Sequence, residues 1–155
     1  MENILLLIFD VLNFGLLVFL WWFSIKNYKA LPETIPTHFD FEGKPDSFGN
    51  KKYFYFMPAI LTLIFFLFGF LVRSPDSANY PVPISEENEN AQFLIMGVFM
   101  RWLLFLLALI FLNSQDYVLR YSFNNSTKPR VAFSTLLLSI IGSLVVLFIF
   151  VGVFK

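Results

Sequence analysis

Four long apolar runs alternate with polar segments along this chain. They cover residues 4–25, 54–72, 93–112 and 131–154. A helix needs about 20 predominantly apolar residues to cross the hydrocarbon core of a bilayer, so each run is long enough to span it. The pattern therefore predicts an all-α integral membrane protein with four transmembrane helices. We expect residues 1–155 to form a single four-span membrane domain.

The polar segment with the strongest local character lies between the first two runs, at residues 29–52. Prolines at its start favour extended backbone before them. Residues 37–42 then alternate as a strand does, and this pattern places Phe39 and Phe41 on one side and His38, Asp40 and Glu42 on the other. Residues 43–46 have turn chemistry, and Gly49-Asn50 is a second break. We expect a compact, structured loop whose phenylalanines rest on the membrane interface or on the end of the bundle.

The third helix is expected to extend beyond its apolar run at both ends. Ser85 is a candidate N-cap, and acidic residues follow it in the first turn, where they suit the helix dipole. This pattern predicts that the helix begins near Glu86. We expect it to continue for a turn or two after Leu112 and to end at residues 124–126.

Composition supports lipid as the solvent for much of the surface. The chain is 57% hydrophobic and 14% charged, whereas soluble domains carry about 25% charged residues. The formal net charge of zero provides no basic field suited to nucleic acid, so no nucleic-acid partner is expected. The absence of cysteine and the single histidine exclude thiolate chemistry and multi-histidine metal sites within one chain, and we expect no cofactor.

Basic residues near the ends of the runs predict the orientation. Eight lie beside or within the segments after the first and third runs, and two lie on the other side. Cytoplasmic loops carry the excess of Lys and Arg, so we expect residues 29–52 to be cytoplasmic and both termini to lie outside. The eight are Lys26, Lys29, Lys44, Lys51, Lys52, Arg120, Lys128 and Arg130, and the two are Arg73 and Lys155.

Two ionisable residues fall inside the predicted spans. At ~1.5 Å per residue, Asp10 lies about 9 Å and Arg101 about 12 Å below the same membrane face. A lone charge at such a depth is costly, so a partner is expected. The two can form an ion pair with Asn13 as a hydrogen-bonding neighbour. Alternatively, Arg101 snorkels to the headgroups while Asp10 faces a wet crevice, or the residues form a proton or ligand site.

The fourth run carries small and hydroxyl residues at helical spacing: Thr135, Ser139 and Ser143, with Ala132 and Gly142 alongside. Small residues let helices approach closely in lipid, so the stripe favours helix packing over a substrate path. The packing can occur within one chain or between copies, and a homo-oligomer is therefore one of the arrangements the stripe allows.

The polar face of the loop is the remaining candidate site. An imidazole and two carboxylates, from His38, Asp40 and Glu42, are able to bind a divalent metal, relay protons, contact a protein partner or simply face water. No phosphate-binding glycine loop, HExxH or GxSxG motif is present, so we expect no enzyme activity, with a metal-dependent membrane enzyme at His38 as the weaker alternative. The candidate partner-binding residues are Pro32, Pro36, His38, Phe39, Asp40, Glu42, Gly43, Pro45 and Asp46.

The loop has the spacing LPxxIPxHFxxxGxPDxxGxK, from Leu31 to Lys51. It resembles a bacterial membrane domain family of unknown function, found at the N-terminus of immunity proteins against the sporulation-delaying-protein toxin. Residues 83–88 resemble the same family, and the matches cover roughly residues 20–105. The resemblance implies a multi-pass protein of the bacterial cytoplasmic membrane. For the immunity proteins it further implies toxin resistance and capture of a transcriptional repressor at the membrane. Those proteins carry an additional C-terminal membrane module, and only the N-terminal module is recognised here.

Two functions follow as hypotheses. The first is a non-enzymatic membrane protein that binds a cytoplasmic protein through its loop, as an immunity, signalling or regulatory component. The alternative is a small oligomeric carrier or channel that uses Asp10, Arg101 and the stripe of the fourth helix.

Overall fold

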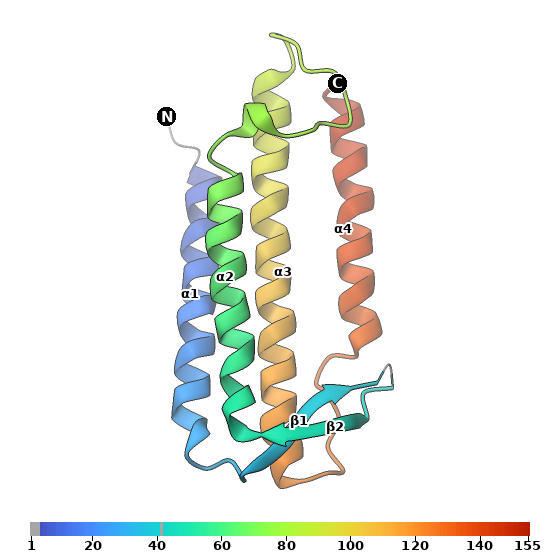
Figure 1. The fold of residues 1–155 in the computed structure, drawn as a ribbon. Helices are drawn as coiled ribbons and strands as arrows, with labels where there is room; N and C mark the ends of the chain where they lie inside the picture. The colour runs from blue at the N-terminus through green and yellow to red at the C-terminus, as the bar shows by residue number, and fades with distance from the viewer. Residues whose placement is uncertain (1–3, 41) are drawn as a thin grey trace.

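Four long helices run side by side in the computed structural model, which describes residues 4–40 and 42–155 (Figure 1). They are α1 (Ile4–Tyr28), α2 (Phe56–Leu71), α3 (Glu89–Phe123) and α4 (Phe133–Val153). Each belongs to a helical segment long and apolar enough to cross a membrane. The expected class, an all-α membrane protein with four transmembrane helices, is confirmed.

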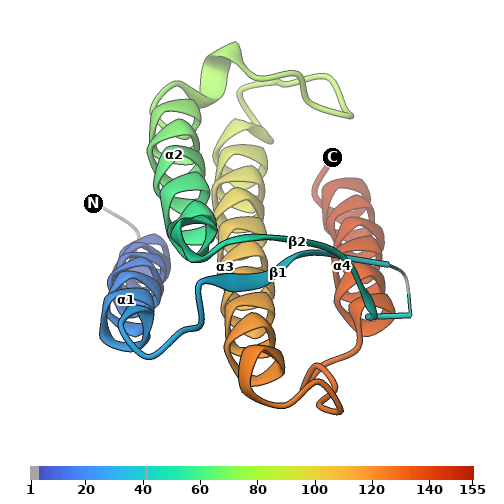
Figure 2. The same ribbon diagram turned by 60° about the horizontal axis from the view of Figure 1, so that its bottom comes forward.

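A two-stranded hairpin lies across the end of the bundle at which α1 ends and α2 begins (Figure 2). Strand β1 (Thr34–Phe39) pairs antiparallel with β2 (Pro45–Asn50). A short 3₁₀ helix, η1 (Lys51–Tyr55), leads from β2 into α2. A second one, η2 (Pro75–Ser77), lies between α2 and α3 at the opposite end of the bundle (Figure 1).

The hairpin corrects two details of the sequence prediction. The first strand begins at Thr34 and ends at Phe39, so the predicted strand at residues 37–42 was displaced towards the turn. Pro45 and Gly49 belong to a second strand and not to a turn and a break. Gly49 pairs with Ile35, and a Cβ added to it would lie 3.0 Å from the Thr37 side chain, so the glycine permits close approach within the strand. Phe41 lies outside the described residues.

The start of α3 also differs from its prediction. The helix begins at Glu89, and Ser85 does not cap it. The Asn88 side chain instead accepts a hydrogen bond from the Ser85 N–H and donates one to the carbonyl of Pro83, which holds these residues in a turn before the helix. At the other end α3 stops at Phe123, next to Asn124, in agreement with the expected end.

Helix α3 lies at the centre of the packing, in contact with α1, α2 and α4. Buried Leu17 and Leu20 of α1, Leu61 of α2 and Leu104 and Ala108 of α3 form one apolar core. Helix α4 packs mainly on α3, and most of its other side chains are exposed. Exposed apolar side chains on these helices suit contact with lipid.

Near the hairpin end, a buried glutamine joins three elements. The Gln115 amide Nε2 of α3 lies 2.8 Å from the Ser24 hydroxyl oxygen of α1 and 2.6 Å from the carbonyl oxygen of Phe54, and it donates to both. Gln115 and Ser24 are almost completely buried, so water cannot replace these bonds.

We predict that Gln115→Leu lowers the free energy of unfolding by about 1–3 kcal/mol, because the Phe54 carbonyl loses a donor in an apolar environment. Thermal unfolding in detergent micelles, followed by circular dichroism, measures the change. The exposed substitution Asn125→Leu is the control and should shift the midpoint little. Equal midpoints for the two variants would contradict the structural role of Gln115.

Candidate functional site

The hairpin turn is built by its own polar groups. The Asp40 carboxylate accepts hydrogen bonds from the backbone N–H groups of Glu42 and Lys44, at 2.9 and 2.8 Å. Gly43 adopts a φ of 79°, a left-handed conformation that a glycine adopts without a steric penalty. The Lys44 ammonium hydrogen-bonds Glu42, and this bond raises the pKa of Lys44. Residues 40–44 therefore form a defined turn without help from a ligand.

Aromatic contacts fasten this hairpin to the end of α3. The Phe39 ring centroid lies 4.7 Å from that of Tyr117 and meets Tyr121 edge-on at 6.4 Å. The buried Tyr117 donates its hydroxyl to the carbonyl of Gly43, at 2.6 Å. Phe39 thus rests on the bundle end, which is one of the two places expected for the loop phenylalanines.

The other end of the hairpin is fixed by a small apolar cluster. Leu31, Ile35, Phe54 and Val118 are buried against one another. The Lys51 ammonium lies 2.9 Å from the Glu33 carboxylate, and the Lys51 N–H donates to the carbonyl of Glu33. The hairpin is therefore held at both ends, and we call its strands together with η1 the hairpin platform (residues 34–40 and 42–55).

The three polar residues of the expected face do not converge. The imidazole Nδ1 of His38 lies 2.6 Å from the carboxylate of Asp46, on the neighbouring strand, and both side chains are exposed. Asp40 binds the turn backbone and Glu42 pairs with Lys44. Among the described residues, no group of three His, Cys, Asp or Glu side chains is placed to hold a metal ion. The partner of His38 is thus Asp46, which the alternation within one strand did not indicate.

The prolines of the candidate set shape the platform from three places. Pro32 is exposed in the connection before β1. Pro36 is buried within β1 opposite Phe48, and Pro45 opens β2 opposite Phe39. None of them offers a functional group to a ligand, so their contribution is to backbone geometry.

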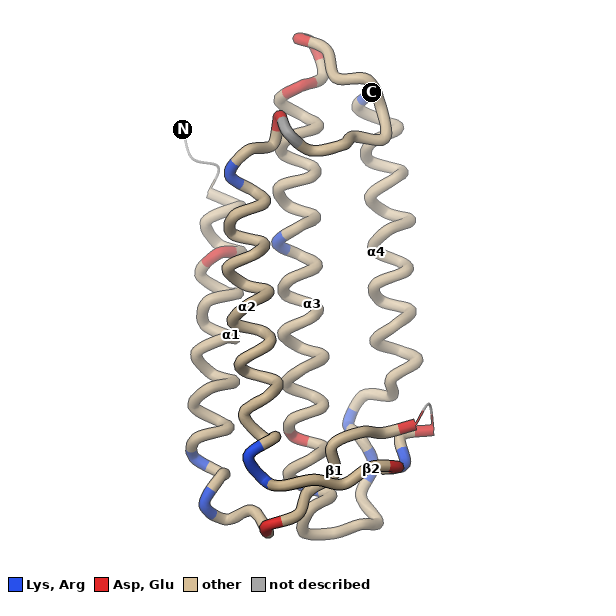
Figure 3. Tube along the Cα trace, viewed as in Figure 1, with Lys and Arg blue, Asp and Glu red and all other residues tan. Residues whose placement is uncertain are grey.

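The outward surface of the platform is aromatic and charged. Phe48 of β2 and Tyr53 of η1 are 58% and 61% exposed. Within the described residues the sheet consists of β1 and β2, so the edge of β2 that faces away from β1 pairs with no further strand. Figure 3 shows that Lys and Arg gather at this end of the bundle. The surface therefore combines exposed rings, cations and an unpaired strand edge.

A carboxylate network supports the segment after α3. Asp116 accepts hydrogen bonds from Arg120, at 2.8 Å, and from Arg130, at 2.9 Å, and the bond to Asp116 raises the pKa of Arg130. Asn113 exchanges two hydrogen bonds with the backbone of Val131. These contacts hold the α3–α4 connection beside the hairpin platform.

The two ionisable residues inside the spans lie together. The Arg101 guanidinium donates from Nε and Nη2 to the two carboxylate oxygens of Asp10, at 2.8 and 3.1 Å. It also donates to the carbonyl of Gly97, one turn towards the end at which α3 begins. Asn13 does not contact Asp10 as expected; its amide donates to the carbonyl of Arg101. The side chain of Arg101 is 15% exposed and that of Asp10 is 52% exposed.

Arg101 also lines a cavity of about 760 Å³ among α1, α3 and the segment after α2. Its polar lining includes Asn79, Tyr80 and Asn90, and burial raises the pKa of Tyr80. A smaller cavity, of about 230 Å³, lies beneath the hairpin platform between Phe39 and Gln115.

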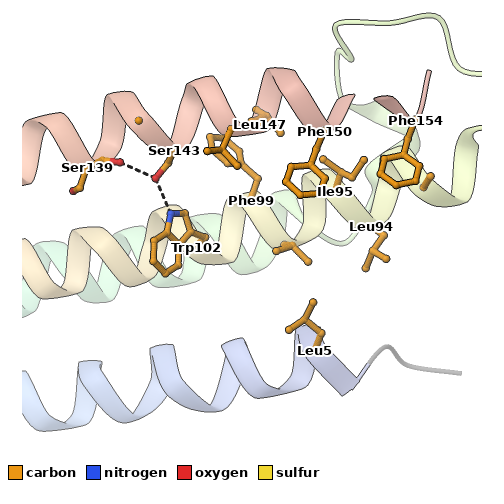
Figure 4. A pocket seen from close by; sticks show the side chains of 14 residues that line it. Leu5, Leu94, Ile95, Phe99, Trp102, Ser139, Ser143, Leu147, Phe150 and Phe154 are labelled. Atoms are coloured by element: carbon orange, nitrogen blue, oxygen red, sulfur yellow. Dashed lines mark hydrogen bonds between the residues drawn. The ribbon is translucent and has the colours of Figure 1, made fainter. Parts of the chain in front are cut away.

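The stripe of the fourth helix faces a different cavity. Ser139 and Ser143 line a groove of about 840 Å³ between α3 and α4 (Figure 4). Ser143 accepts a hydrogen bond from the indole of Trp102, at 2.7 Å, and donates to the carbonyl of Ser139. Thr135 does not line this groove. Arg101 and the stripe are thus not part of one cavity.

A domain of unknown function, DUF1648, matches residues 15–62 of this chain. The match covers the hairpin platform with the adjoining parts of α1 and α2. An uncharacterized protein of Archaeoglobus fulgidus is 38% identical over 52 residues, which are 34% of this chain and 28% of that protein. The chain therefore spans little more than a quarter of the length of this relative. No solved structure matches.

We predict that Asp10 and Arg101 are energetically coupled. A double-mutant cycle with Asp10→Asn and Arg101→Gln should give a coupling energy of about 0.5–3 kcal/mol, since each single change leaves a charge in the membrane without its partner. Unfolding midpoints in detergent micelles supply the four values. Asn13→Ala with Arg101→Gln is the control cycle, because Asn13 binds the backbone of Arg101 and not its charge. Additive effects of the two charge changes would contradict the pair.

Proposed function

We propose that this chain is a non-enzymatic membrane protein that binds a protein partner through the hairpin platform. The observation that carries the proposal is the construction of the platform: a turn closed by Asp40, a ring contact between Phe39 and Tyr117 and a buried cluster around Ile35 hold it in place. A surface fixed before binding loses little conformational entropy on association. The match to the domain of unknown function falls on the same residues.

The open edge of β2 defines the kind of partner. An unpaired strand edge offers a row of backbone donors and acceptors to an extended peptide, which adds to the sheet as a further strand. Phe48 belongs to β2 and Tyr53 to the η1 helix that follows it, and their exposed rings supply apolar anchors. We infer that the partner contributes an extended segment with at least one apolar side chain.

The proposal places the platform in the cytoplasm of a bacterium and the chain in the cytoplasmic membrane. The gathering of Lys and Arg at the hairpin end supports this orientation (Figure 3). A partner inside the cell fits an immunity, signalling or regulatory role, as the loop resemblance implies. The carrier alternative is less well supported, because Arg101 and the stripe of α4 line separate cavities.

The orientation predicts unequal labelling of two exposed positions. The chain contains no cysteine, so Ser47→Cys on β2 and Asn79→Cys after α2 each provide a single thiol. An impermeant maleimide added to intact bacteria should modify Asn79→Cys and leave Ser47→Cys unmodified. Both should react after the membrane is permeabilised. Labelling of Ser47→Cys in intact cells would reverse the orientation.

Partner binding predicts a site-specific cross-link. The photoreactive residue p-benzoylphenylalanine, placed at Phe48, should give a discrete cross-linked species on illumination of living cells, and mass spectrometry identifies the attached chain. Adding Tyr53→Ala should weaken this species, because it removes the second anchor. The control position is Phe66 on α2, which is 68% exposed and lies within an apolar span. The same species from both positions, or none from Phe48, would contradict the proposal.

A further inference from the structure

The groove between α3 and α4 is a cavity that partner binding does not use. Its volume of about 840 Å³ falls within the ~300–1,000 Å³ typical of ligand pockets. Figure 4 shows rings and aliphatic side chains from both helices around it, with Leu5 of α1 at its far side. It lies within segments apolar enough to cross a membrane, so its surroundings are hydrocarbon.

The polar atoms of this lining are occupied by the protein itself. The Ser143 hydroxyl binds the indole of Trp102 and the carbonyl of Ser139, and the Ser139 hydroxyl donates to the carbonyl of Leu136. A polar ligand would therefore bury its own hydrogen-bonding groups without partners, at a cost of several kcal/mol, on the order of the transfer penalty for an amide. The groove fits an apolar occupant.

The length of the groove distinguishes between two apolar occupants, a lipid tail and a transmembrane helix of a second copy. At ~1.5 Å per residue, its lining extends about 16 Å on α3, from Ala91 to Trp102, and about 22 Å on the α4 side, from Phe154 to Ser139. One leaflet contributes about 15 Å to a hydrocarbon core of ~30 Å. The Trp102–Ser143 hydrogen bond joins the helices near the inner end of the groove. A transmembrane helix of a second copy crosses the whole core of ~30 Å, so the groove would cover only part of it, whereas an acyl chain extends through one leaflet.

We propose that this groove holds one acyl chain of a phospholipid, from the leaflet at the end of the bundle where α4 ends. The tail fills the space beside Gly142 and Phe99, with its methyl end near Trp102. Helix α4 packs mainly on α3. A lipid in the groove therefore adds contacts between α4 and the rest of the bundle. The headgroup lies at the interface beside Phe154.

Filling the groove tests the proposal. A Cβ built on Gly142 meets no atom within 4 Å, so the open groove accommodates the side chain of Gly142→Phe. The full chain is reconstituted in vesicles of phosphatidylethanolamine, extracted in mild detergent and examined by native mass spectrometry. We expect about one retained lipid per wild-type chain, as the volume allows, and at least a ~10-fold lower retained fraction for Gly142→Phe.

The matched control is Gly152→Phe, the same change on the same helix at an exposed glycine that does not line the groove. It should retain lipid as the wild type does. Ala91→Phe fills the mouth from α3 and replaces Gly142→Phe if circular dichroism shows that the latter is unfolded. Equal lipid retention by a folded groove-filling variant and the control would overturn the proposal. Efficient disulfide cross-linking of Ser139→Cys between two chains in the membrane would also overturn it, in favour of a second copy.

Discussion

Hydrogen bonds from the polar side chains of α3 determine how the other elements are arranged. Between helices in a bilayer, lipid tails are as apolar as the side chains they would replace, so apolar contact alone gives little specificity. Helix α3 instead carries polar groups at intervals along its length, and these bind α1, α4, η1, the hairpin and the segment before α4. In chain order these groups are Gln92 to α4, Arg101 to α1, Trp102 to α4, Asn113 to the segment before α4, Gln115 to α1 and η1, and Tyr117 to the hairpin.

The ion pair between Asp10 and Arg101 places two charges inside the membrane, where an unpaired charge is costly, and several hydrogen bonds compensate this cost. A bidentate bond to Asp10 and a third bond to the carbonyl of Gly97 use three N–H groups of Arg101. Asn13 of α1 donates a hydrogen bond to the backbone carbonyl of Arg101. Helix α1 therefore binds both the side chain and the main chain of Arg101. Such a cluster fixes the register of the two helices, because sliding either helix by one residue would separate the charges in a medium that does not solvate them.

The sequence predicted what depends on local pattern and missed what depends on long-range contact. The helices and the nearness of Asp10 to Arg101 follow from run lengths and depth. Strand β2 was missed because its residues, Pro45 to Asn50, have turn chemistry, and pairing with β1 overrides that preference. Ser85 has the residue type of an N-cap, but Asn88 binds its N–H and delays the helix. The partners of Gln115 and Tyr117, the carbonyls of Phe54 and Gly43, are 61 and 74 residues away in the sequence, so no local pattern indicates these bonds.

Polar side chains of α3 make contacts at both ends of the bundle. Helix α3 is continuous over 35 residues, about 52 Å at ~1.5 Å per residue, and its contact with the hairpin platform at Tyr117 lies about 22 Å from Trp102, at the nearer end of the groove. Tyr117 binds the hairpin platform, and Gln92 and Trp102 of the same helix bind α4. Helix α4 packs mainly on α3, so its position depends on these bonds, whereas α1 and α2 share a buried apolar core with α3.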